Sequence, residues 1–163
     1  MQIKTNNYLI HFNDDENLLK STKSLELLES LLYKLDDSQQ ILGEETFDQL
    51  ELELSLINSN DMQEVNLQHR GFDKSTDVLS FPSQESIRSG DYELVNKSVH
   101  LGDILICHEV CEKQAAEHKI AYEDEFIHLF AHGLLHLYGY DHELSEEEDK
   151  LMRSLESKLI DLI

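Results

Sequence analysis

Lysine, arginine, proline and cysteine are scarce in this chain of 163 residues, and tryptophan is absent. The single proline, Pro82, and six scattered glycines leave no linker, so we predict one domain over residues 1–163. Two cysteines, Cys107 and Cys111, are too few for a disulfide framework. Their spacing on an expected helix indicates reduced, partly buried thiols, because a metal site there would lack a second pair of ligands.

Long apolar runs are also missing. No run approaches the roughly 18–20 residues that cross a bilayer. The N-terminal segment, MQIKTNNYLIHFNDD, lacks the charged start, apolar core and small-residue cleavage site of a secretion signal. We therefore expect a cytoplasmic protein without a membrane partner. Apolar residues still make up 40% of the chain, a proportion typical of a folded domain with a hydrophobic core.

The charge is strongly one-sided. Lysine and arginine number 13 against 34 aspartate and glutamate residues, which gives a net charge of −21. Nucleic acids are bound through lysine and arginine, so this charge alone argues against a polyanionic partner. Residues 70–119 are closer to neutral, with 9 acidic and 6 basic residues. If any face meets an anion, we expect this segment to supply it, through a basic groove around Arg70, Lys74 and Lys97.

The hydrophobic pattern predicts an α+β fold, with helices packed mainly on one face of a small mixed sheet of about four strands. Leucines at alternate positions from Leu50 to Leu56 predict a strand with one solvated face. Strands near 78–81 and 100–106 have no helix between them, which favours an antiparallel pair. Asp61 is expected to cap the helix that follows it. The other expected elements are a strand over 2–12 and helices over 16–35, 108–119, 122–138 and 144–162.

Three histidines with metal-ligand spacing lie near the end of the chain, in the segment HGLLHLYGYDH. His132 and His136 are one helical turn apart and project from the same face, which suits two ligands of a tetrahedral ion. Gly139 is placed to end the helix and return His142 to the same ion. Three imidazoles suit zinc and leave a fourth position for water, so we expect one catalytic zinc ion per chain. His128, one turn earlier, is the alternative third ligand or a supporting residue.

The residue after the first histidine separates this pattern from the metzincin proteases. Those proteases share the H-x3-H-x2-G-x2-H spacing but carry a glutamate there, the base of zinc-assisted peptide hydrolysis. This chain has Gly133 instead, so a metallopeptidase is the lesser alternative. Asp141, beside His142, is a candidate carboxylate for orienting a ligand.

A second block, RGFDKSTDVLSFP, is a polar turn that enters an expected strand. Thr76 and Asp77 are suited to cap that strand by bonding backbone groups. Taken alone, Arg70 reads as a solvated surface side chain, and Asp103 as a residue that ends a turn.

Together, these blocks resemble the YbeY family of bacterial metal-dependent endoribonucleases of rRNA maturation. The resemblance covers about residues 57–160. It departs from the family at His69, where tyrosine is usual, and at Ser75, where proline is usual. The residues that carry it are Asn66, Arg70-Gly71, Thr76 to Pro82, Leu101 to Ile104, His132 to His142, Met152 and Glu156.

The resemblance implies that residues 1–163 form one zinc-dependent hydrolase domain, with the ion on His132, His136 and His142. It implies an endoribonuclease that prefers single-stranded RNA and acts in maturation of the small-subunit (16S) rRNA 3′ end and in ribosome quality control. Its partners would be rRNA and the small ribosomal subunit or its proteins, rather than DNA. Arg70 matches a functionally important arginine of the family, which implies contact with the scissile phosphate. A non-catalytic, zinc-stabilised ribosome-assembly factor stays open, because an acidic chain suits basic ribosomal proteins.

Overall fold

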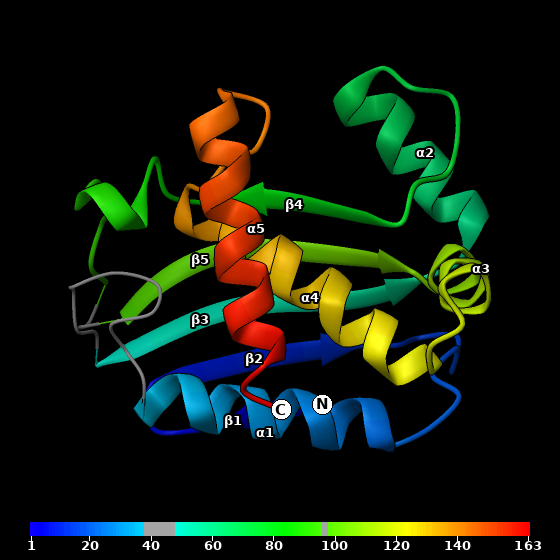
Figure 1. The fold of residues 1–163 in the computed structure, drawn as a ribbon, viewed down its shortest axis with the longest axis horizontal. Helices are drawn as coiled ribbons and strands as arrows, with labels where there is room; N and C mark the ends of the chain where they lie inside the picture. The colour runs from blue at the N-terminus through cyan, green and yellow to red at the C-terminus, as the bar shows by residue number, and fades with distance from the viewer. Residues whose placement is uncertain (38–47, 96–97) are drawn as a thin grey trace.

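A mixed β-sheet forms the middle of the molecule, with three helices, α1, α4 and α5, over one of its faces (Figure 1). The computed structural model describes residues 1–37, 48–95 and 98–163, and within them the sheet has five strands in the order β1-β2-β3-β5-β4. The strands are β1 Gln2–Lys4, β2 Tyr8–Asn13, β3 Gln49–Ile57, β4 Val78–Pro82 and β5 Ser98–Cys107. The helices are α1 Lys23–Asp37, α2 Ser59–Arg70, α3 His108–His118, α4 Tyr122–Tyr138 and α5 Glu146–Ile160, with a short 3-10 helix, η2, at Ile87–Ser89.

The strand directions confirm the predicted α+β class and the antiparallel pair. β2, β3 and β5 are parallel, while β1 and β4 run antiparallel at the two edges. The prediction of about four strands was one short, because the segment 2–12 is a hairpin of two strands. The Asp36 carboxylate of α1 accepts hydrogen bonds from the backbone of Asn6 (2.8 Å) and Asn7 (3.1 Å), which holds that turn in place.

Two helices begin at positions that differ from the predictions. The first helix starts at Lys23 rather than near residue 16, because the Asp14 carboxylate accepts the backbone N–H groups of Leu18 and Leu19 in a turn. Asn58, not Asp61, is the N-cap of α2, and its side-chain oxygen accepts the N–H of Asp61 at 2.9 Å. Local side-chain bonds of this kind compete with the helix and are invisible to hydrophobic periodicity.

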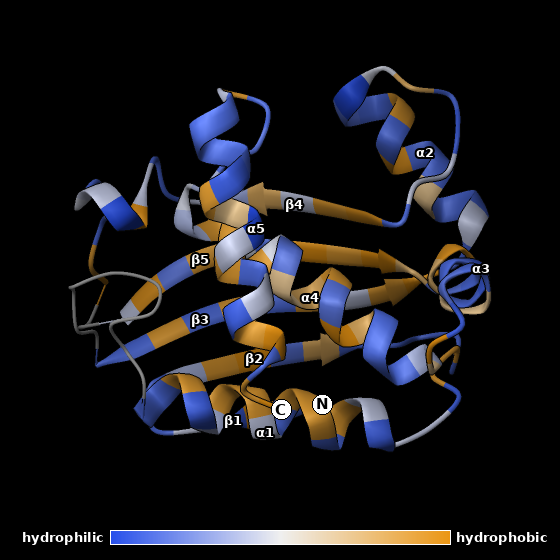
Figure 2. Cartoon of the chain, viewed as in Figure 1, coloured by the Kyte–Doolittle hydropathy of each residue, from blue (hydrophilic) through white to orange (hydrophobic). Residues whose placement is uncertain are grey.

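The core lies between the sheet and the helices α1, α4 and α5. Leu52 and Leu54 of β3 are fully buried, whereas Glu51 and Glu53, which alternate with them, lie on the opposite, partly exposed face. Figure 2 shows this alternation of polar and apolar residues along the strands. A second, smaller cluster joins α2 to that opposite face at one end of the sheet; its buried members are Met62, Leu79 and Cys107.

A β-bulge interrupts β5 at the segment Leu101-Gly102-Asp103. Opposite β3 the pairing passes from His100 to Gly102, so Leu101 is an extra residue, and Gly102 has φ +129°. A Cβ on Gly102 would lie 2.1 Å from the backbone oxygen of Phe81. Asp103 consequently lies inside a strand, so the prediction that it ends a turn was wrong.

No helix in the described part of the chain is long and apolar enough to cross a membrane.

Gly102→Ala should destabilise the fold more than Gly90→Ala. Both glycines have positive φ, so alanine at either position carries a backbone cost of about 1–2 kcal/mol. Only Gly102 also faces a backbone clash, because a Cβ on Gly90 meets nothing within 4 Å. Urea denaturation should give a difference of about 1–3 kcal/mol in the free energy of unfolding between the two variants. Equal losses would contradict the importance of the bulge.

Candidate metal centre

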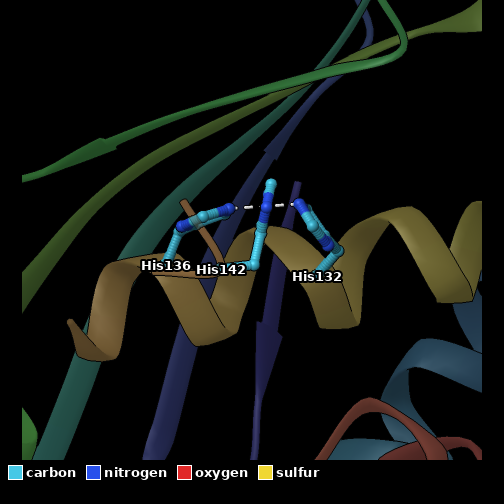
Figure 3. A group of neighbouring side chains, drawn as sticks. All are labelled: His132, His136 and His142. Atoms are coloured by element: carbon cyan, nitrogen blue, oxygen red, sulfur yellow. Dashed lines mark hydrogen bonds between the residues drawn. The ribbon is translucent and has the colours of Figure 1, made fainter. Parts of the chain in front are cut away.

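Helix α4 carries two of the predicted ligands on its one partly exposed stripe. Most of its other side chains are buried, so the helix is held on nearly all sides and His132 and His136 are fixed in direction. The helix ends at Gly139, which has φ +95° and whose N–H donates to the carbonyls of Leu135 and His136. The chain reverses there and brings His142 back over the same stripe (Figure 3).

The three histidines meet at one point, as predicted from their spacing. Each offers one ring nitrogen, and these three atoms all lie within 4.8 Å of one another. The Nε2 atoms of His132 and His136 are 3.1 Å apart. Two nitrogen ligands of a tetrahedral zinc ion, each at about 2.0–2.1 Å, would be separated by about 3.3 Å. The group can therefore hold a metal ion without rearrangement of the helix.

Glu156 of α5 fixes the ring of His132. Its Oε1 lies 2.5 Å from Nδ1 of His132, which leaves Nε2 directed at the other histidines. Burial by itself would raise the pKa of Glu156, but the hydrogen bond and charge of His132, together with the charge of His128, hold it below its ordinary value. The carboxylate thus stays ionised and acts as a strong acceptor.

Asp141 does not have the role predicted for it. Its Oδ1 accepts the backbone N–H of Glu143 at 2.9 Å, so it stabilises the turn around His142 instead of orienting a ring. The carboxylate that does so, Glu156, lies 24 residues after His132 on another helix. Sequence spacing within one helix cannot reveal such a partner.

Electrostatics keep His136 available as a ligand. Burial lowers its pKa, and the neighbouring rings of His132 and His142 lower it further. Neutral imidazole is the form that binds a metal ion. The protein environment therefore favours the protonation state that a metal site needs.

Gly133 allows α4 to lie directly on the sheet. A Cβ at this position would come within 3.0 Å of both the Ile104 side chain and the Ser80 hydroxyl. A glutamate, the residue that metzincin proteases carry here, would have to enter this contact. The missing base is therefore a consequence of packing as well as a feature of the sequence.

The turn that carries His142 is held by the segment around η2, which sequence reasoning did not single out. A Cβ on Gly139 would lie 2.7 Å from the Ser86 hydroxyl, so this segment presses on the turn. The guanidinium of Arg88 lies 4.6 Å from the centre of the Tyr140 ring and 2.9 Å from the carboxylate of Glu148. One arginine thereby links the turn to the first part of α5.

A cavity of about 340 Å³ adjoins the histidines between α3, α4, α5 and the start of β4. His128 lines it but does not join the three-histidine group, so the structure favours His142 as the third member. The buried Glu125 carboxylate lies between two histidines, 3.0 Å from Nδ1 of His118 and 3.9 Å from Nδ1 of His128. His128 is therefore a neighbour of the centre with a partner of its own.

Arg70 lies at the open edge of β4. Among the described residues that line the cavity, Arg70 is not included. Its side chain is exposed, and its Nη2 donates to the backbone oxygen of Ser80 at 3.3 Å. The Ser80 hydroxyl in turn lies against Gly133, between the two helical histidines. The predicted basic groove also included Lys74 and Lys97. Lys74, four residues after Arg70, is exposed, whereas Lys97 lies outside the described residues.

The loop between Arg70 and β4 is fixed from both sides. The Asn66 side chain donates to the backbone oxygen of Lys74 at 2.7 Å. Asp77 accepts the N–H of Val78 at 2.8 Å, which confirms its predicted capping role, and its other oxygen accepts the amide of Gln114 at 2.9 Å. The loop thus has a defined path beside the centre.

Both cysteines are free and buried, as predicted, although Cys107 precedes helix α3 instead of lying within it. Burial raises the pKa of Cys111 to about 12, so its thiol stays protonated at neutral pH. A protonated thiol is not a metal ligand.

The chain is similar in sequence to known proteins. A family model described as "Endoribonuclease YbeY" matches residues 10–163. Two curated proteins named "Endoribonuclease YbeY" are among the relatives. The one from Persephonella marina is 40% identical over 125 residues, covering 77% of this chain and 78% of its own. The one from Leptospira biflexa is 35% identical over 153 residues, covering 94% of this chain and 92% of its own.

A solved structure has the same fold. The solution structure of TM1509 from Thermotoga maritima matches with a TM-score of 0.60 and 27% identity, over 94% of this chain and 87% of that chain. The family model covers almost the whole sequence, including all three histidines and Glu156, which bonds to His132. This chain therefore belongs to the endoribonuclease YbeY family.

Proposed function

We propose that this protein is a zinc-dependent endoribonuclease that cleaves single-stranded RNA, with one zinc ion per chain on His132, His136 and His142. The observation that carries the proposal is the convergence of three ring nitrogens within 4.8 Å, in a chain whose relatives are named endoribonucleases. Imidazole donors favour zinc among the common divalent metals, and three of them leave a position open for catalysis.

The cellular role we propose is maturation of the 3′ end of the small-subunit (16S) rRNA and ribosome quality control in the cytoplasm. Its partners there would be rRNA and the small ribosomal subunit. The resemblance of the motifs to the YbeY family supports this role. Residues 1–163 would act as one hydrolase domain, since α4, α5 and the strands of the sheet share one hydrophobic core.

Each residue of the proposed centre has a separate task. A bound zinc ion would supply Lewis acidity toward the phosphodiester. Glu156 holds the His132 ring in place through Nδ1, and so would direct Nε2 at a bound ion. Arg70 is the proposed partner of the negative charge that develops on the scissile phosphate, and its hydrogen bond to the Ser80 carbonyl limits where its guanidinium can lie. Gly133 leaves peptide hydrolysis without its usual base.

Glu156→Gln should weaken zinc binding about 10- to 100-fold, because the amide no longer holds the His132 ring with a charged acceptor. Competition with a chromogenic chelator measures this affinity. Glu147→Gln is the matched control, since it makes the same change on the exposed side of the same helix. Equal affinities in the two variants would exclude a supporting role for Glu156.

The proposed activity is tested with zinc-loaded protein, end-labelled single-stranded rRNA fragments and casein in parallel. We expect RNA fragments that disappear on chelation, and His136→Ala should lose both zinc and cleavage. Casein peptides in place of RNA fragments would indicate a metallopeptidase. If neither substrate is cut while the protein still binds small ribosomal subunits, the protein is a non-catalytic assembly factor.

Arg70→Gln should retain zinc but lower the rate constant for RNA cleavage about 100-fold, the typical effect of removing one donor to a developing anion. Lys113→Gln, which removes an exposed cation from α3, is the control and should cleave at the unaltered rate. Single-turnover kinetics at saturating protein separate the chemical step from binding. Undiminished turnover in Arg70→Gln would remove Arg70 from the mechanism.

A further inference from the structure

The aromatic side chain of Phe72, two residues after Arg70, is exposed and takes no part in the hydrophobic core. Phe72 is 60% exposed, more than any other aromatic residue in the part of the chain that the structure describes. It follows Gly71, the residue that ends α2. A phenylalanine buries a large apolar surface when it packs, so leaving it in water forgoes stability. Packing therefore does not account for this residue.

The loop holds this ring in a fixed place. The N–H of Phe72 donates to the backbone oxygen of Asn66, and the N–H of Lys74 donates to the oxygen of Phe72 at 2.9 Å. Asn66 is 3% exposed and also donates to the Lys74 backbone. On the other side of the loop, Asp73 accepts the amide of Gln63 at 2.8 Å. The exposed ring is thus presented by a backbone that is already ordered.

Two cations accompany the ring. The Nζ atom of Lys74 lies 5.9 Å from the centre of the Phe72 ring, within the range of a cation–π interaction. Arg70, two residues before, is exposed as well. Only 13 of the 163 residues are lysine or arginine, so two within five positions of so acidic a chain form a distinct local feature. We name Arg70, Phe72 and Lys74 the Phe72 platform.

We infer that the Phe72 platform binds single-stranded RNA by stacking one unpaired base on the Phe72 ring, while Lys74 contacts a backbone phosphate. Exposed aromatic rings flanked by cations are the usual means by which proteins hold unpaired nucleotides, because every base has a face that can stack. A base inside a duplex has both faces covered, so the platform selects single strands. This inference rests on the proposed function, whose substrate site it names.

Two successive contacts connect the platform to the candidate metal centre. Arg70 donates to the carbonyl of Ser80, on the edge strand β4. The Ser80 hydroxyl touches α4 at Gly133, the residue that follows His132. A strand whose base is stacked on Phe72 would present its neighbouring phosphates to Arg70 and to the β4 edge. The platform would therefore set the position of the RNA, and Phe72 is a positioning residue rather than a catalytic one.

The inference is tested by binding, separately from cleavage. Zinc-loaded protein is titrated into a fluorescein-labelled, 2′-O-methylated octamer, and into the same octamer with abasic sites in place of its bases. Phe72→Leu should weaken binding of the octamer with bases about tenfold relative to the unaltered protein. Phe72→Trp should bind this octamer at least as tightly as the unaltered protein does. Neither variant should change binding of the abasic octamer, because a phosphate backbone cannot stack. Leu94→Ala, at a side chain that is 59% exposed on another loop, is the control.

Lys74→Gln should reduce the salt dependence of octamer binding by close to one phosphate contact, a change of about 0.7 in the slope of log K against log salt. Thermal unfolding checks that every variant is folded. Equal loss of affinity for both octamers in Phe72→Leu, or no loss for either, would overturn the platform. An octamer that binds normally to a protein without RNA cleavage would instead contradict the proposed activity alone.

Discussion

The close approach of α4 to strands β4 and β5 is the constraint on which the rest of the structure depends. Gly133 contacts the Ile104 side chain and the Ser80 hydroxyl so tightly that a side chain would not fit without a shift. With the helix pressed onto the sheet, its buried residues fill the core, and only the stripe of His132 and His136 remains open. One packing contact thus decides how far the candidate ligands stand from the sheet.

The rest of the centre is assembled by contacts that cross the fold. Gly139 reverses the chain, and the segment around η2 closes on that reversal through Ser86 and through Arg88. Helix α5 then supplies the carboxylate of Glu156. Three acidic residues of this strongly negative chain lie against arginine or histidine side chains around the centre: Glu125, Glu148 and Glu156. The net charge of the chain therefore does not describe the local charge at the site. Electrostatic effects at the site act over distances shorter than the screening length of about 8 Å at physiological salt.

The two positions at which the sequence is expected to depart from the family pattern, His69 and Ser75, make local contacts. His69 lies edge-on to the Phe81 ring, with the ring centres 5.0 Å apart. The Ser75 hydroxyl lies 3.5 Å from the sulfur of Cys107, where a proline would have made no such bond. The loop still keeps its path, because Asn66 and Asp77 bond its backbone from either end. The backbone of the loop is therefore held by residues other than His69 and Ser75.

The spacing of His132, His136 and His142, with Gly139 between the second and third, was enough by itself to predict that the three would meet. Helical periodicity and the freedom of glycine at positive φ are local properties, so the sequence alone predicts where α4 ends and where the chain turns. Alternating leucines likewise predicted β3. The tertiary structure alone decided that Glu156 rather than Asp141 bonds to His132, that His128 lies outside the three-histidine group, and that Phe72 is exposed. Those outcomes depend on which segments, distant in the chain, pack against one another, and local patterns do not carry that information.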